Sequence, residues 1–233
     1  MTLDRSVLLT VYILCIRHGE LTPTGALSAR GLDQMADMAR VWSRHPDWAS
    51  FNRAYTSPIA PAIMSTNRFL GELHALSGGP VLDASLPSLD LTFLDQKKQV
   101  ALEALRGSVD DLLTDTTALE LRGRMIVTLQ NAAKECADEM IGNTRAVVGD
   151  IAADKHATAS DLASVFGRGK RAVLIVGQSP LLELAAVEPL RTPRLRHGDA
   201  ILYTVTMSAV EVSGLWQRRF LIKQSERLLC PSG

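Results

Sequence analysis

The chain has 233 residues, 46% of them hydrophobic, which is enough to bury a sizeable core in one α/β domain. Its 25 basic and 25 acidic residues balance, so the chain lacks the excess of basic residues that is typical of proteins that bind nucleic acid or an acidic membrane. No apolar run reaches the ~18 residues of a membrane span. The three cysteines, Cys15, Cys136 and Cys230, show no metal spacing and cannot all pair. This cysteine usage favours a reducing cytoplasm.

The first element is an apolar run from Val7 to Ile16, which predicts a buried strand. The run lacks the small-residue cleavage site of a signal peptide and leads straight into Arg17-His18-Gly19-Glu20. These four residues should lie at the carboxyl end of the strand, the edge of an open α/β sheet at which ligands bind. The Arg17 guanidinium suits a phosphate or carboxylate, His18 is a candidate nucleophile or proton carrier, and Gly19 allows a sharp turn.

A helix and a second strand are predicted next. Ser28 is the expected N-cap of the helix, and Leu32, Met35, Ala39 and Trp42 fall on one face of it, as in a helix that packs on a sheet. The strand covers residues 53–56 and ends at Ser57-Pro58. The helix after it has Pro61 near its start, where proline fits well.

The middle of the chain is predicted to be mainly helical. A Gly-Gly-Pro turn leads to a short strand at 81–83, and residues 97–168 read as helix. Leu119, Ile126, Leu129, Ala133, Cys136 and Met140 share one helical face, which we interpret as core. Residues 141–169 are predicted to form an extra helical pair or a lid. There are no repeats and no linker, so we predict a single domain over 1–233.

Three strands are predicted in the last third of the chain. Residues 172–176 are apolar and indicate a buried parallel strand that ends at Gly177-Gln178-Ser179-Pro180, with a helix from 181. A strand over about 200–205 and an edge strand within 210–229 follow. The tripeptide Arg-His-Gly recurs at 196–198, but before a strand. We therefore expect it at the opposite edge of the sheet or in a loop, and interpret it as chance or a turn.

In order and spacing, these stretches resemble the histidine phosphatase (phosphoglycerate mutase-like) superfamily. The resemblance rests on Arg17-His18-Gly19 after the first strand, on Leu27-Ser28-x-x-Gly31-x-x-Gln34-Met35-Ala36, on Ser57-Pro58, and on the strand ending at Gly177. It covers about residues 7–205. It implies a three-layer α/β/α sandwich with a mostly parallel central sheet, in which His18 and Gln178 lie at adjacent strand ends facing one cleft. Residues 97–168 would form a helical cap or insertion.

The resemblance also implies roles for individual residues. His18 would be the nucleophile that becomes phosphorylated, and Asp90 would stand at the position of the family's acidic proton donor, with Asp95 as a rival. The phosphate or substrate would be bound by Arg17, Gly19, Glu20, Ser57, Gln178 and Ser179. No metal and no other cofactor is implied.

Two positions depart from the family pattern. Pro61 stands where active members have a second phosphate-binding arginine, and Gln178 stands where they have a second histidine. The loss of one preorganised donor at such a centre commonly costs ~10²–10³ in rate. Candidate replacement cations are Arg30, Arg68, Arg191, Arg194 and Arg196.

Three functions therefore stay open. The first is binding of a small phosphorylated or anionic molecule with weak or no phosphatase turnover. The second is an active phosphomonoesterase that works through phospho-His18 and a substitute arginine. The third is a repurposed enzyme that uses His18 as acid or base on a substrate without phosphate. The expected partner is the small ligand, not nucleic acid or membrane, and an apolar helix face could also serve a homodimer.

Overall fold

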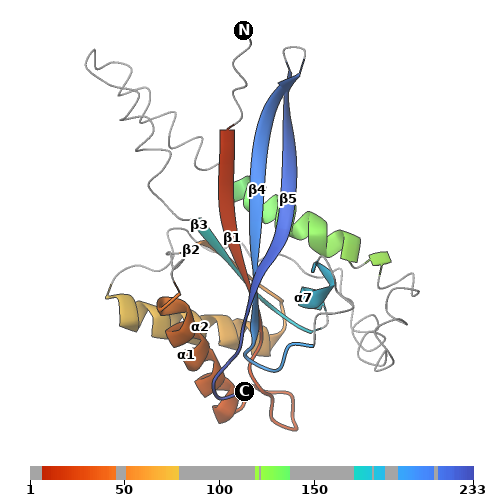
Figure 1. Cartoon of the computed structure of the whole chain (residues 1–233). Coiled ribbons are helices and arrows are strands. Elements are labelled where there is room, and N and C mark those ends of the chain that lie inside the picture. The colour runs from red at the N-terminus through yellow and green to blue at the C-terminus, as the bar shows by residue number, and fades with distance from the viewer. Residues whose placement is uncertain are drawn as a thin grey trace.

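The computed structural model describes residues 7–45, 51–78, 119–120, 122–136, 171–179, 181–186, 194–212 and 215–233. One five-stranded sheet runs through this part of the chain in the order β2-β3-β1-β4-β5 (Figure 1). Its strands are β1 (Val7–Arg17), β2 (Phe51–Thr56), β3 (Arg171–Gly177), β4 (Ala200–Val212) and β5 (Leu215–Leu228). The labelled helices are α1 (Ala29–Ser43), α2 (Ala60–Ser77) and the single turn α7 (Leu181–Leu184), and residues 122–136 are also helical.

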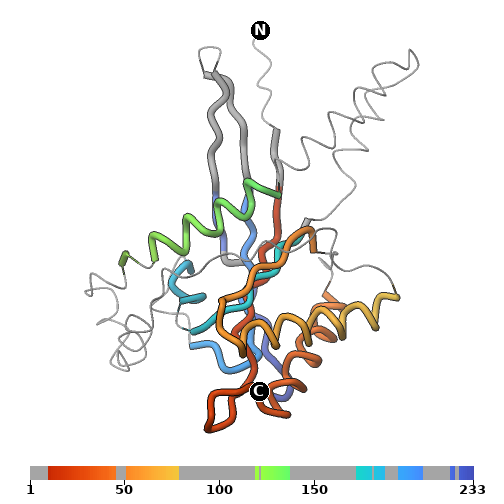
Figure 2. The backbone as a smooth tube through the Cα atoms, turned by 180° about the vertical axis from the view of Figure 1, so that it is seen from behind, coloured from red at the N-terminus to blue at the C-terminus, as the bar shows by residue number. Residues whose placement is uncertain are grey.

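The helices cover both faces of the sheet. On one face α1 and α2 bury side chains such as Trp42 and Phe69 against the strands. On the other face the 122–136 helix, green in Figure 2, buries Leu129 and Ala133 beside α7. The chain therefore has the α/β/α layering predicted from its sequence.

Strand direction decides which chain segments meet at the edge of the sheet. β1 pairs in parallel with β3, and β3 with β2, whereas β4 is antiparallel to both β1 and β5. Four of the five strands thus point the same way, and the sheet is mostly parallel in direction. Because β4 is reversed, its first residue, Ala200, lies opposite Ile16 near the end of β1.

Local signals explain how the first two helices begin and end. The Ser28 Oγ accepts a hydrogen bond from the Gly31 N–H at 2.9 Å, so Ser28 is the N-cap of α1 as predicted. Pro61 lies in the first turn of α2, where its missing N–H costs little. Gly78 ends α2 in a left-handed conformation with φ 66°.

Several predictions fall outside the described residues: the strand at 81–83, Asp90, Asp95, and most of 97–168. Where this region is described, at 122–136, Leu129, Ala133 and Cys136 are buried, which confirms this face as core. Leu119, predicted on the same face, is 46% exposed. None of the helices in the described ranges is long and apolar enough to span a bilayer.

We expect all three thiols to resist labelling in the folded protein. Cys15, Cys136 and Cys230 are at most 2% exposed and none forms a disulfide. Burial also raises the pKa of Cys15 and of Cys230, which disfavours the reactive thiolate. A disulfide-exchange reagent should modify three thiols per chain rapidly in urea and far more slowly in buffer. Fast labelling in buffer would contradict this packing.

Candidate functional site

Four strand ends meet along one edge of the sheet. Ser57, Gln178 and His18 directly follow β2, β3 and β1, and the loop before β4 joins them. The His18 N–H donates to the Gly177 carbonyl at 3.0 Å, and the Ser57 N–H donates to the Val176 carbonyl at 2.9 Å. The pairing of Arg17 with Gly177 places His18 and Gln178 at adjacent strand ends, as the sequence predicts.

The His18 ring is held in one orientation. It is only 6% exposed, and its Nδ1 lies 2.8 Å from the Gly19 carbonyl oxygen. A carbonyl oxygen only accepts, so Nδ1 carries the proton of the neutral ring and donates it. In that neutral ring Nε2 is the nitrogen without a proton. The imidazole is thus arranged to act through Nε2, either as a nucleophile or as a base.

The turn after β1 is clamped between α1 and α2. The Gly19 N–H donates to the Ser65 Oγ of α2 at 3.1 Å. Gly19 and Gly31 pack backbone against backbone, and a Cβ on Gly19 would lie 2.8 Å from the Gly31 Cα. The Glu20 N–H donates to Gln34 Oε1 of α1 at 2.8 Å. These contacts leave the His18 backbone little freedom.

Arg17 is already engaged by the loop before β4. Its Nη1 donates to the Leu195 carbonyl at 2.5 Å, and its Nη2 lies 3.2 Å from His197 Nε2. A guanidinium can only donate, so His197 Nε2 accepts and the proton of this neutral ring is on Nδ1. Burial, followed by the charges of Arg17 and His18, lowers the pKa of His197 to about 4. His197 is therefore neutral at pH 7.

The position of His197 corrects the sequence interpretation of the second Arg-His-Gly tripeptide. We expected it at the opposite edge of the sheet or in a loop, and interpreted it as chance or a turn. It does form a loop, but this loop lies at the same edge as His18, and the two ring centroids are 5.5 Å apart. The reason is the reversed direction of β4, because the start of an antiparallel strand adjoins the end of its neighbour.

Glu183 of α7 is a buried carboxylate that sequence reasoning missed. It is 4% exposed, and its Oε1 accepts hydrogen bonds from Ser179 Oγ and, at 2.7 Å, from the Leu195 N–H. Burial raises its pKa, against the opposing effects of these hydrogen bonds and of the Arg17 charge. Its only signal in the sequence is one acidic residue within an otherwise apolar stretch, 181–186. Ser179, predicted to bind ligand, donates to this carboxylate.

Gln178 and Pro61, the two positions at which the sequence departs from the pattern it resembles, both lie in the described part of the chain. Gln178 is half-buried, and its Nε2 has no hydrogen-bond partner among the described residues. Pro61 is buried one helical turn before Ser65, the residue that contacts Gly19. A side chain at position 61 therefore starts on the face of α2 that meets the turn after β1.

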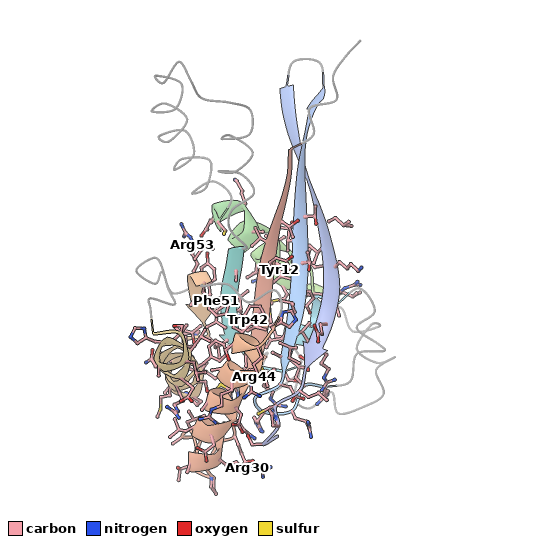
Figure 3. All side chains as sticks on the ribbon, turned by 60° about the vertical axis from the view of Figure 1, so that its left-hand side comes forward. Tyr12, Arg30, Trp42, Arg44, Phe51 and Arg53 are labelled. Atoms are coloured by element: carbon pink, nitrogen blue, oxygen red, sulfur yellow. The ribbon has the colours of Figure 1, made fainter. Side chains whose placement is uncertain are left out.

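Three of the five candidate replacement arginines have carboxylate partners elsewhere. Arg68 pairs with Glu72 at 3.2 Å, and Arg196 with Asp199 at 3.4 Å. Arg30, labelled in Figure 3 on α1, lies 3.4 Å from Glu20, which places that carboxylate toward α1. Arg194 is exposed, and Arg191 and Asp90 lie outside the described residues. No group of three or more metal-ligand side chains occurs in the part of the chain that the structure describes.

Comparison with known proteins finds solved structures that are similar to this chain. No family model matches the sequence, and no curated protein matches it. A mycobacterial glucosyl-3-phosphoglycerate phosphatase is 12% identical, with 94% of this chain and 100% of that chain covered and a TM-score of 0.37. Phosphoglycerate mutase from Plasmodium falciparum is 12% identical, with 91% and 99% covered and a TM-score of 0.32.

A third similar structure, a mycobacterial hydrolase, is 11% identical, with 93% of this chain and 99% of that chain covered and a TM-score of 0.39. Because every one of these TM-scores is below 0.5, the likenesses carry no argument about what this chain does.

Proposed function

We propose that this chain is a divergent histidine-phosphatase-like protein that binds a small phosphorylated or anionic molecule at Arg17 and His18, with weak or no phosphatase turnover. One observation carries the proposal: the hydrogen bond from His18 Nδ1 to the Gly19 carbonyl, which orients the ring at the strand end that directly follows Arg17. A fixed imidazole next to a cation can receive or orient a phosphoryl group. The order of sequence motifs supports the same family.

Weak turnover follows from the charge of the site. Phosphoryl transfer needs fixed donors to neutralise the equatorial oxygens in the transition state. The positions of Pro61 and Gln178 supply no charge, and Arg17 already donates to Leu195 and His197. Each missing donor commonly costs ~10²–10³ in rate, although grouped residues need not add.

The remaining predicted residues would support this site. Gly19 and Ser57 shape the edge through their backbones, while Glu20 and Ser179 act on neighbours in the protein, Arg30 and Glu183. Asp90 stays a prediction as proton donor. The alternative of an active phosphomonoesterase requires a further cation near His18.

We expect the wild-type chain to turn over an aryl phosphate slowly or not at all, and the double substitution Pro61→Arg with Gln178→His to raise the rate by ~10²-fold or more. The physical reason is that the two changes restore two donors around a histidine that is already oriented. Steady-state assays and acid-labile phosphoenzyme labelling would measure the effect. Adding His18→Asn should abolish both rate and label.

Matched controls place the same residue types at positions that are not among the strand-end residues. Ala60→Arg puts the arginine on the exposed neighbour of Pro61, and Gln130→His puts the histidine on the 122–136 helix. Neither should raise the rate. A wild-type chain that turns over rapidly and loses activity on His18→Asn would instead support the active phosphomonoesterase. Phosphatase activity that survives His18→Asn would contradict a role for this edge of the sheet.

A further inference from the structure

His197 is a second imidazole at the anion site, and its surroundings set its charge. Its Nε2 accepts a hydrogen bond from Arg17 Nη2 at 3.2 Å, and its ring centroid lies 5.5 Å from that of His18. In this state the ring must be neutral, because a protonated Nε2 could not accept. The Arg17–His197 hydrogen bond and a positive charge on His197 are therefore mutually exclusive.

The charged groups around His197 explain why it is neutral without a ligand. Arg17 and His18 face it from the end of β1, and both lower its pKa in addition to burial. Glu183 of α7 interacts with Arg17. In the loop of His197 itself, the Asp199 carboxylate is already bonded to Arg196 and Arg227. Burial, Arg17 and His18 thus keep the His197 ring unprotonated when no ligand is bound.

A dianion beside Arg17 would reverse this balance. It would give the guanidinium a stronger acceptor than an imidazole nitrogen, and so release His197 Nε2. Two negative charges near the ring would also favour its charged form, since an opposite charge within ~4–6 Å typically shifts a pKa by ~1–3. His197 could then take one proton from solvent and donate to the same ligand. A monoanion would give a smaller effect.

We infer that His197 is a binding residue of the proposed site, that it takes up a proton when a tetrahedral dianion binds beside Arg17, and that it thereby favours dianions over monoanions. This inference rests on the proposed function, and it assigns to His197 the positive charge that Gln178 cannot carry. It concerns binding, so it holds whether or not phosphoryl transfer follows.

The first test follows His197 itself in the wild-type chain by NMR of its ring nitrogens. The chain has five histidines, so five single His→Asn variants assign the signals. Sulfate is the probe, because it stays dianionic across the pH range and any pH dependence then comes from the protein. At pH 5 we expect saturating sulfate to convert His197 from the neutral to the protonated ring. His74, which is exposed on α2, should not respond.

The second test measures sulfate affinity by calorimetry at pH 5 and pH 7. If a bound dianion raises the pKa of His197 from about 4 to about 6, linkage predicts that affinity falls about 10-fold between these pH values. His197→Asn should lose this 10-fold dependence and His74→Asn should keep it. The variant should also lose the preference for sulfate over methanesulfonate, a tetrahedral monoanion. Circular dichroism checks that His197→Asn is folded.

The outcomes separate the two proposals. Sulfate binding that leaves the His197 ring neutral, together with an unchanged pH dependence in His197→Asn, would overturn the role of His197 and leave the anion site standing. If the wild-type chain binds sulfate neither at pH 5 nor at pH 7, both the anion site and the role of His197 are overturned. Protonation of His197 on binding, without any phosphoenzyme at His18, would support the inference and limit the protein to binding.

Discussion

Gly31→Ala should lower the free energy of unfolding by about 3 kcal/mol, although alanine is the better helix former by about 1 kcal/mol. A Cβ at this position would lie 2.8 Å from the Glu20 nitrogen and 2.8 Å from Leu27 Cδ1, and closer still to the Glu20 carbonyl oxygen. The Leu27 side chain can rotate away. The Glu20 backbone cannot, because it follows the strand-end turn that holds His18.

The same substitution at Gly71 is a matched control for Gly31→Ala. Gly71 is an exposed residue within α2, and a Cβ there would meet nothing within 4 Å. Gly71→Ala should therefore stabilise the protein by about 0.5–1 kcal/mol, the usual gain of alanine over glycine within a helix. Urea unfolding measures both variants. Equal effects at the two positions would contradict a tight contact between α1 and the turn.

Replacing Asp199 by alanine should cost about 3–5 kcal/mol, the usual penalty for removing one partner of a buried charged pair. Asp199 is fully buried. Its Oδ1 accepts from the Cys230 N–H at 2.9 Å, and its Oδ2 accepts from the Arg196 N–H at 3.1 Å and from Arg227 Nη2 at 3.0 Å. One carboxylate thus joins the loop before β4 to β5 and to the chain that follows it.

The pH dependence of stability distinguishes this buried carboxylate from an exposed one. Hydrogen bonds from Cys230, Arg227 and Arg196 lower the pKa of Asp199 despite its burial. A lowered folded-state pKa adds stability above the unfolded-state pKa, and this stability is lost as pH falls through the folded value. The difference in stability between wild type and Asp199→Ala should therefore narrow as pH falls below the usual aspartate pKa of about 4. Asp37→Ala, which removes an exposed pair with Arg40, should cost at most about 1 kcal/mol.

Most of the framework could be predicted because its signals are local. The apolar run before Arg17, the Ser28 cap, and the proline at the start of α2 each act within a few residues, and each element forms where it was expected. The final edge strand, predicted within 210–229, is β5. Even the adjacency of His18 and Gln178 follows from two parallel strands that end in polar residues.

The rest of the site could not be predicted because it depends on strand direction and burial. Nothing in residues 196–198 shows that the following strand runs antiparallel to β1, so the approach of His197 to His18 is visible only in three dimensions. Glu183 and Asp199 look like ordinary surface acids in the sequence, yet both are at least 96% buried. The residues that surround them come from segments that are distant in the sequence. The periodicity of hydrophobic residues within a short window contains no information about such distant segments.

The reversed strand β4 also determines when the site can form during synthesis. Arg17 bonds to residues 178 and 180 positions further along the chain. A chain that emerges from the ribosome N-terminus first therefore exposes His18 long before Leu195 and His197 are made. The strand-end site can be completed only after Leu195 and His197 have been translated. A ligand that binds there should accordingly act on the finished fold, and should not guide the early steps of folding.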